Sequence, residues 1–127
     1  MIDWDKLNKI NVRELTDAQT KHLVCKALIV QRLLIKYHNK KQHIQIYTEV
    51  PIENGRICDV YFSNNITKEC IAYEIQSNVS AKWLVETKKI YANWEVYNMT
   101  TDLVIIRLDE LSDNINILKG ELDKLIV

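Results

Sequence analysis

Asp59, Glu74 and Gln76 are the residues of this chain whose types and spacing best suit chemistry. Glu74 and Gln76 lie two positions apart in a stretch where two sets of residues alternate, so a β-strand would place both on one face. Asp59 lies in the preceding apolar stretch, which we predict to be the adjacent strand of a hairpin. Asp59 and Glu74 are therefore expected to approach each other.

A carboxylate pair in this position points to a metal ion. Two carboxylates that meet in a mostly apolar sheet repel each other and lose hydration, and a divalent cation would cancel that cost. Mg²⁺ prefers oxygen ligands, including one or two carboxylates, with water and substrate phosphate completing its shell. We therefore expect Asp59 and Glu74 to bind Mg²⁺ or Mn²⁺, with the backbone carbonyl of Ile75 as a further ligand. Such an ion would polarise a scissile phosphate and activate a water.

The elements that must position these residues are predicted from hydrophobic periodicity and from turn residues. Thr16 and Asp17 offer an N-cap before a long helical pattern, and Pro51 and Gly55 mark the end of the first strand and its turn. Helices are expected over residues 16–37, 80–96 and 112–126, and strands over 43–52, 56–62, 69–76 and 102–108.

The resulting order is α-β-β-β-α-β-α, which predicts an α/β fold with a mixed central sheet flanked by helices. Short turns make the three consecutive strands an antiparallel meander, and the strand–helix–strand order implies a parallel crossover. The last strand, DLVIIRL (102–108), is almost continuously apolar and is expected to be buried on both faces.

Length and charge limit the class of protein. The chain has 127 residues, of which 47% are hydrophobic, so we expect a single domain over 1–127. It carries 17 basic and 17 acidic residues, so any contact with nucleic acid must be a local patch. The N-terminus lacks the pattern of a signal peptide, and no stretch approaches the ~20 apolar residues of a membrane span. A cytoplasmic protein without a membrane partner is expected.

Cysteines and histidines show no metal-binding spacing. Cys25, Cys58 and Cys70 each fall in an apolar stretch and are expected to be buried and reduced, although Cys58 and Cys70 could meet on adjacent strands. His22 and the other two histidines are expected to be solvated or to lie in the core.

The predicted elements and their acidic residues resemble the PD-(D/E)XK, or restriction endonuclease-like, nuclease superfamily. The matching segments are ICDVYF around Asp59 and AYEIQS around Glu74 and Gln76, and the resemblance covers roughly residues 15–108. It implies a restriction endonuclease-like core and metal-dependent hydrolysis of DNA. Such minimal nucleases tend to recognise the shape of DNA, as Holliday-junction resolvases do, and many work as homodimers.

The same resemblance implies further site residues. The superfamily often has an additional upstream acid, for which Glu49 and Glu14 are the candidates. Gln76 stands where a lysine is usual; a neutral amide can hold a water by hydrogen bonds but supplies no charge. Apart from the resemblance, we hypothesise that the missing charge comes from Lys82, in the first turn of the next predicted helix, or from Lys89 on the same helix.

Within the superfamily, residues 74–96 are similar to the competence-protein CoiA-like nucleases. Those proteins have a Glu-x-Gln strand end followed by a helix with Glu-Arg-x-x-x-Tyr. Glu86 and Tyr91 have that spacing, while Thr87 occupies the arginine position.

Simpler roles exist for each residue alone. Asp59 could pair with Arg56 or Arg107, and Glu74 could lie on a solvated strand face. The functional alternative to a nuclease is a catalytically inactive module on the same fold that binds nucleic acid or protein. A purely structural partner protein is a third hypothesis, which predicts exposed apolar residues on the last helix: Ile115, Leu118, Leu122 and Leu125.

Overall fold

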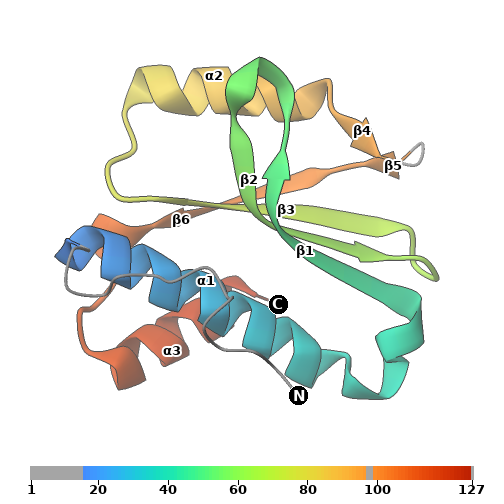
Figure 1. Ribbon diagram of the computed structural model, residues 1–127, viewed down its shortest axis with the longest axis horizontal. Helices are drawn as coiled ribbons and strands as arrows, with labels where there is room; N and C mark the ends of the chain where they lie inside the picture. The colour runs from blue at the N-terminus through green and yellow to red at the C-terminus, as the bar shows by residue number, and fades with distance from the viewer. Residues whose placement is uncertain (1–15, 97–98, 127) are drawn as a thin grey trace, which may run out of the picture.

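A four-stranded mixed sheet forms the centre of the computed structural model, which describes residues 16–96 and 99–126 (Figure 1). Its strands, in spatial order, are β1 (Ile44–Pro51), β2 (Ile57–Asn64), β3 (Glu69–Gln76) and β6 (Asp102–Arg107). The first three pair antiparallel, and β6 pairs parallel with β3. The predicted antiparallel meander and parallel crossover are therefore confirmed.

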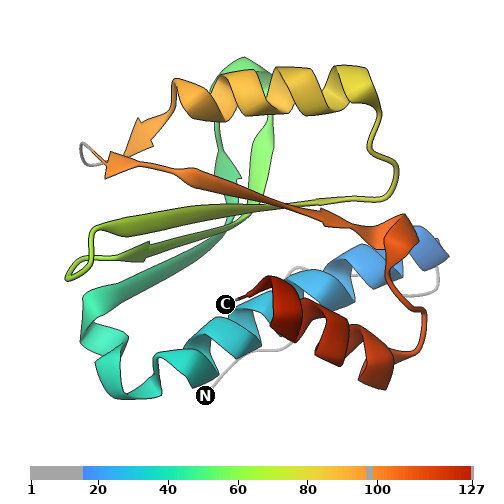
Figure 2. The ribbon, with the colours of Figure 1, turned by 180° about the vertical axis from the view of Figure 1, so that it is seen from behind.

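Helices cover both faces of this sheet, as the two opposite views show (Figures 1 and 2). Helix α2 (Ala81–Ala92) lies on one face, while α1 (Asp17–Lys36) and α3 (Ile115–Leu125) lie on the other. The prediction of a mixed sheet flanked by helices is confirmed in this general form. No helix among residues 16–96 and 99–126 is long and apolar enough to cross a membrane.

Helix α1 has the boundaries that its sequence predicts. The Thr16 hydroxyl accepts a hydrogen bond from the Gln19 amide nitrogen at 3.1 Å, and the Gln19 side chain accepts one from the Thr16 nitrogen at 2.9 Å. This reciprocal capping box satisfies two amide groups that a helix start leaves free. The polar stretch that follows α1 forms a 3-10 helix, His38–His43.

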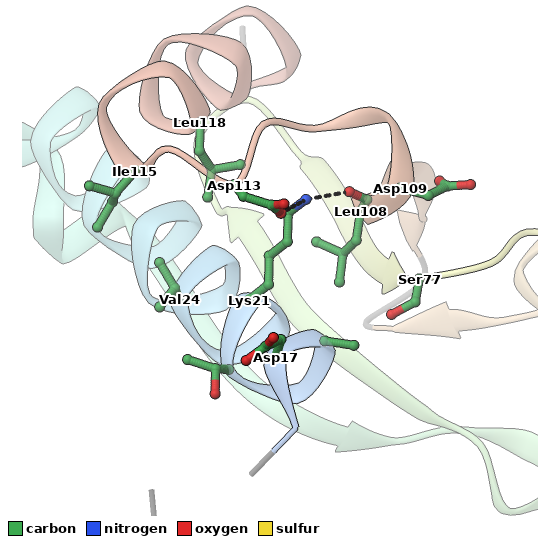
Figure 3. A pocket seen from close by; sticks show the side chains of 11 residues that line it. Asp17, Lys21, Val24, Ser77, Leu108, Asp109, Asp113, Ile115 and Leu118 are labelled. Carbon is green, nitrogen blue, oxygen red and sulfur yellow. Dashed lines mark hydrogen bonds and ion pairs between the residues drawn. The ribbon is translucent and has the colours of Figure 1, made fainter. Parts of the chain in front are cut away.

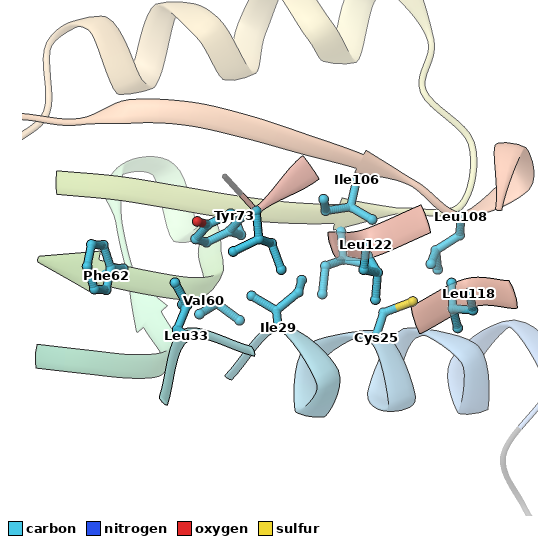
Figure 4. Packing of buried hydrophobic residues seen from close by; sticks show 12 residues of the cluster. Cys25, Ile29, Leu33, Val60, Phe62, Tyr73, Ile106, Leu108, Leu118 and Leu122 are labelled. Atoms are coloured by element: carbon cyan, nitrogen blue, oxygen red, sulfur yellow. The ribbon is translucent and has the colours of Figure 1, made fainter. Parts of the chain in front are cut away.

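The larger hydrophobic core lies between the sheet and the α1–α3 layer (Figure 4). Cys25, Ile29 and Leu33 recur every four residues along α1 and are fully buried, as one face of a helix requires. They pack against inward-facing side chains of β2, β3, β6 and α3, which include Val60, Phe62, Tyr73, Ile106, Leu118 and Leu122.

A smaller core lies between the sheet and α2. Ser80 caps this helix by accepting a hydrogen bond from the Trp83 nitrogen at 3.1 Å, and Thr87 and Tyr91 are its buried residues. The helix ends at Ala92 rather than at residue 96. The residues after it form a short hairpin, β4 (Glu95–Val96) with β5 (Met99–Thr100), that was not predicted.

Two predictions about the C-terminal third of the chain were wrong. Strand β6 lies at an edge of the sheet, and its residues are mostly half-buried, with Ile106 fully buried. Helix α3 begins at Ile115 rather than at residue 112, because the Asn114 side chain caps it and a 3-10 helix, Leu108–Glu110, occupies part of the connection. Leu118 is buried, as are its neighbours on the inner face of α3.

Exposed apolar residues on the last helix, the feature that would favour a structural partner protein, are found at some of its positions. Ile115 and Leu125 are exposed, whereas Leu118 and Leu122 belong to the larger core.

All three cysteines are buried, and none forms a disulfide with another. Cys70 lies opposite Ser63 in the β2–β3 register, so it does not face Cys58. Burial raises the pKa of Cys58 to about 12 and that of Cys25 to about 11, which keeps both thiols protonated at neutral pH. The prediction that these thiols are buried is confirmed.

Candidate functional site

Asp59 lies where the pairing between β2 and β3 ends. The last registered pair of that ladder is Val60 with Tyr73. Beyond it the Asp59 side chain takes the place of a backbone partner, and its Oδ2 accepts a hydrogen bond from the Ile75 nitrogen at 2.7 Å. In an extended strand the N–H and C=O of one residue point to the same side. The Ile75 carbonyl therefore faces the same gap as the carboxylate of Asp59.

Glu74 is buried on the α2 side of β3, with an exposed fraction of 5%. Its Oε1 accepts a hydrogen bond from the hydroxyl of Tyr91 on α2. Burial raises the pKa of Glu74 to about 7; the Tyr91 hydrogen bond opposes this shift, and the neighbouring Asp59 carboxylate adds to it. The structure thus brings Asp59 and Glu74 together, as the alternation of β3 and the hairpin predict.

Asp59 has a partner that the sequence did not suggest. The Nε2 atom of His22, on α1, lies 3.1 Å from Asp59 Oδ1. The hydrogen bond to Asp59 raises the pKa of His22, against the effect of burial. Asp59 pairs with neither Arg56 nor Arg107, the two partners considered from sequence. The sequence feature that could have indicated this contact is the position of His22 on α1, three residues before the buried Cys25.

Glu49 lies next to this cluster but its charge is compensated. It falls between the registered pairs Thr48–Val60 and Val50–Cys58, which places it opposite Asp59 across β1 and β2. Its carboxylate forms an ion pair with Lys26, one turn after His22 on α1. The other candidate acid, Glu14, lies outside the described residues.

Gln76 and Lys82, the other two predicted site residues, differ in the side of the fold on which they lie. Gln76 shares the α2-facing side of β3 by alternation and is half-buried. Lys82 is exposed, and helical geometry places it on the side of α2 opposite the buried Thr87 and Tyr91. Lys89 shares that outer side. The structure therefore does not direct the predicted lysines at the carboxylates.

A different cation, Arg56, lies on the inner side of α2. Its guanidinium donates a hydrogen bond to the hydroxyl of Thr87, which is fully buried. The same guanidinium stacks over the ring of Trp83, 5.2 Å from the ring centre. Its charge lowers the pKa of Glu74. Two helix positions of the CoiA-like pattern therefore have contacts in this fold: Tyr91 contacts Glu74, and Thr87 contacts Arg56.

The donor set predicted from the sequence consists of two carboxylates, Asp59 and Glu74, and the backbone carbonyl of Ile75. Among the part of the chain that the structure describes, no group of three or more His, Cys, Asp or Glu side chains is arranged to hold a metal. Asp59 and Glu74 with the Ile75 carbonyl are oxygen donors throughout, which is the chemistry that Mg²⁺ accepts with water completing its shell.

A cavity of about 590 Å³ lies apart from these carboxylates (Figure 3). It opens between the start of α1, the end of β6 and α3, and neither Asp59 nor Glu74 lines it. Lys21 crosses its wall, and its amine donates to the carbonyls of Leu108 at 2.7 Å and Leu111 at 2.5 Å and to Asp113 at 3.0 Å. This amine ties α1 to the β6–α3 connection and is not free for a ligand.

Comparison with known proteins identifies no relative: no family model, curated protein or solved structure matches this chain. The fold is a mixed α/β arrangement with a four-stranded sheet flanked by helices. Membership of the PD-(D/E)XK superfamily therefore stays a prediction from the sequence of this chain.

Proposed function

We propose that this chain is a metal-dependent nuclease with a restriction endonuclease-like core that hydrolyses DNA phosphodiester bonds. The observation that carries the proposal is the pair Asp59 and Glu74, brought together where β2 and β3 part. Two acids in this buried position destabilise the sheet unless a proton or a cation compensates them. The antiparallel meander, the crossover through α2 and the parallel strand β6 are consistent with that core.

Asp59, Glu74 and the carbonyl of Ile75 would hold Mg²⁺ or Mn²⁺. When bound, the ion would polarise the scissile phosphate and lower the pKa of a water. Loading requires Glu74 to lose its proton, because only the ionised carboxylate is a good ligand. Since its pKa is about 7, metal affinity is expected to increase from pH 6 to pH 8.

The surrounding side chains fix the orientation of these donors. His22 holds one oxygen of Asp59 and the Ile75 nitrogen holds the other, so the carboxylate cannot rotate freely. Tyr91 holds one oxygen of Glu74 in the same way. Gln76, one alternation further along β3, can position a water by hydrogen bonds. Glu49 lies at the edge of the site, where its pair with Lys26 limits it to an assisting role.

The substrate proposed for this site is DNA recognised by shape. Most described residues belong to the sheet or to the helices that cover it, which leaves no separate sequence-reading element among them. The decisive experiment incubates the purified chain with branched, single-stranded and duplex DNA in Mg²⁺, Mn²⁺ or EDTA. Cleavage should require metal and should be lost in Asp59→Asn and Glu74→Gln.

Matched controls exist for both substitutions. Asp102→Asn removes an exposed acid at the start of β6, and Glu69→Gln removes one at the start of β3. Both controls should cleave like the parent. If Asp59→Asn and Glu74→Gln also cleave like the parent, the proposed site is wrong.

A second candidate function is a binding module that has lost catalysis. Gln76 in place of a lysine, and the outward position of Lys82 and Lys89, favour it, because neither of these two lysines is directed at the carboxylates. This alternative predicts DNA or protein binding that is unchanged in EDTA and in Asp59→Asn, together with no cleavage of any DNA.

A further inference from the structure

Arg56 is held in a fixed position without an acidic partner. One nitrogen of its guanidinium donates to the Thr87 hydroxyl, and the guanidinium plane lies over Trp83. Among the side chains that the structure describes, no carboxylate lies within ion-pair distance of Arg56. Thr87 is completely buried, so its hydroxyl is a rigid anchor. An immobilised, half-buried cation with unused donors is equipped to bind an anion.

The contact with Thr87 also places Arg56 beside the proposed site. Thr87 and Tyr91 lie one turn apart on the buried side of α2, which separates their positions by roughly 6 Å. Tyr91 contacts Glu74 and Thr87 contacts Arg56. The guanidinium therefore lies on the same face of α2 as Tyr91, near enough to Glu74 for its charge to lower the pKa of that carboxyl.

The other cations near the site are less suitable. Lys26 is paired with Glu49 and has a side-chain exposure of 17%. Lys82 is exposed on the outer side of α2. Arg56 thus combines proximity to the carboxylates with an uncompensated charge.

We infer that Arg56 is the phosphate-binding residue of this site and contacts a backbone phosphate of the nucleic acid next to the scissile bond. This role rests on the proposed nuclease function. The planar fork of a guanidinium matches two phosphate oxygens, whereas an ammonium group offers only a point charge. Arg56 provides a positive charge that Gln76 cannot supply, and Thr87 and Trp83 hold it ready before substrate binds.

Binding measured without metal tests this role separately from cleavage. Fluorescence anisotropy with labelled duplex and single-stranded DNA in EDTA compares the parent with Arg56→Gln and with Lys119→Gln, an exposed charge on α3. Arg56→Gln should weaken duplex binding about tenfold and reduce the slope of log affinity against log salt by about 0.9, the value for one phosphate contact. Lys119→Gln should bind like the parent. Equal affinity and slope for Arg56→Gln and the parent would overturn the inference.

Two further variants keep the test informative if Arg56→Gln unfolds. Arg56→Lys retains the charge but loses the fork, so it should keep most of the salt slope and lose part of the affinity. Thr87→Val removes the anchoring hydroxyl while preserving shape, and should weaken binding without changing the net charge. Circular dichroism establishes that each variant is folded. Parent-like affinity in both folded variants would contradict the role of Arg56.

The outcomes separate this inference from the proposed function. If the parent binds DNA through Arg56 but never cleaves it, the phosphate contact stands and the nuclease proposal fails. If the parent cleaves DNA and Arg56→Gln binds and cleaves normally, the nuclease proposal stands and the role of Arg56 fails.

Discussion

The two faces of the sheet are built differently. The face under α1 and α3 is covered by a continuous apolar core in which Ile29 and Leu33 are almost fully buried. The face under α2 has a smaller apolar cluster and also buries Glu74 and Thr87. The first face provides most of the burial that stabilises the fold, and the second carries groups that are costly to bury.

This difference between the faces concerns the buried polar groups Glu74 and Thr87, which lie on the α2 face. Buried polar groups are tolerated when each has a partner, and the pairs Tyr91–Glu74 and Arg56–Thr87 meet that condition on the α2 face. Asp59 lies at the end of the β2–β3 ladder, where it contacts His22 from the opposite layer. The proposed site therefore has contacts from both layers: His22 of α1 contacts Asp59, and Tyr91 of α2 contacts Glu74.

The largest expected effect separates activity from stability. Asp59→Asn should lower DNA cleavage by about 10³-fold or more, because several kcal/mol of charge stabilisation depend on the metal ligand. Its unfolding transition should remain cooperative, since asparagine can still accept the hydrogen bond of the Ile75 nitrogen. Gel-based cleavage rates and thermal melts of the same samples provide both quantities. Loss of the fold together with activity would show that Asp59 is structural.

On the α1 face, we expect a substitution to lower the stability of the fold without touching the proposed site. Ile29→Ala should lower the free energy of unfolding by about 2–5 kcal/mol, because it leaves a cavity in the larger core. The exposed Ile117 is a matched control, and Ile117→Ala should change stability by less than about 0.5 kcal/mol. Urea titration measures both. Similar losses for the two variants would contradict the assignment of this face as the stabilising one.

Glu74 should make stability depend on pH. Because its pKa is raised to about 7, the folded state holds this proton more tightly than the unfolded state does. The stability contributed by protonation is fully present below the unfolded pKa of about 4.5 and is lost as pH rises through about 7. Without metal, Glu74→Gln should therefore be more stable than the parent at pH 8, by up to about 3 kcal/mol.

His22 acts in the same direction: the stability contributed by its raised pKa is fully present below the unfolded pKa of 6.5 and is lost as pH rises through the higher folded pKa. Urea titrations of the parent and Glu74→Gln at pH 5 and pH 8 in EDTA isolate the part due to Glu74. A difference between the two proteins that is the same at both pH values would show that Glu74 does not titrate in this range.

The smallest effect is expected far from the site. Thr16→Ala should lower stability by about 1 kcal/mol, because it removes half of the capping box of α1. Cleavage should be unchanged once the variant is folded. A thermal melt detects the loss, and Thr16→Ser, which keeps the hydroxyl, should restore most of it.

Local signals predicted much of the fold. The capping residues and apolar spacing of α1 gave both of its ends, and Pro51 with the following turn separated the first two strands. The approach of Asp59 to Glu74 followed from strand alternation and one hairpin. These features depend on residues close in sequence, where the geometry of one element or one turn is sufficient.

The contacts between layers could not be predicted in this way. His22 reaching Asp59 and Arg56 reaching Thr87 depend on how each helix is rotated about its axis against the sheet, which tertiary packing decides. The partial exposure of β6 depends on its position at the sheet edge, which its apolar composition does not reveal. Lys82 was placed in the site by its position in sequence, and the rotation of α2 turns it outward.

The backbone of Glu49 has a consequence for how copies of this chain behave in concentrated solution. Strand β1 forms one outer edge of the sheet, and such edges can template aggregation by pairing with strands of other molecules. Glu49, in this edge, has a φ of 56°, which lies in the left-handed region that extended strands do not use. Pro51, at the end of the strand, lacks an N–H to donate. The hydrogen-bond ladder that an incoming strand could form along β1 is therefore interrupted. This interruption lowers the tendency of the edge to pair with strands of other molecules.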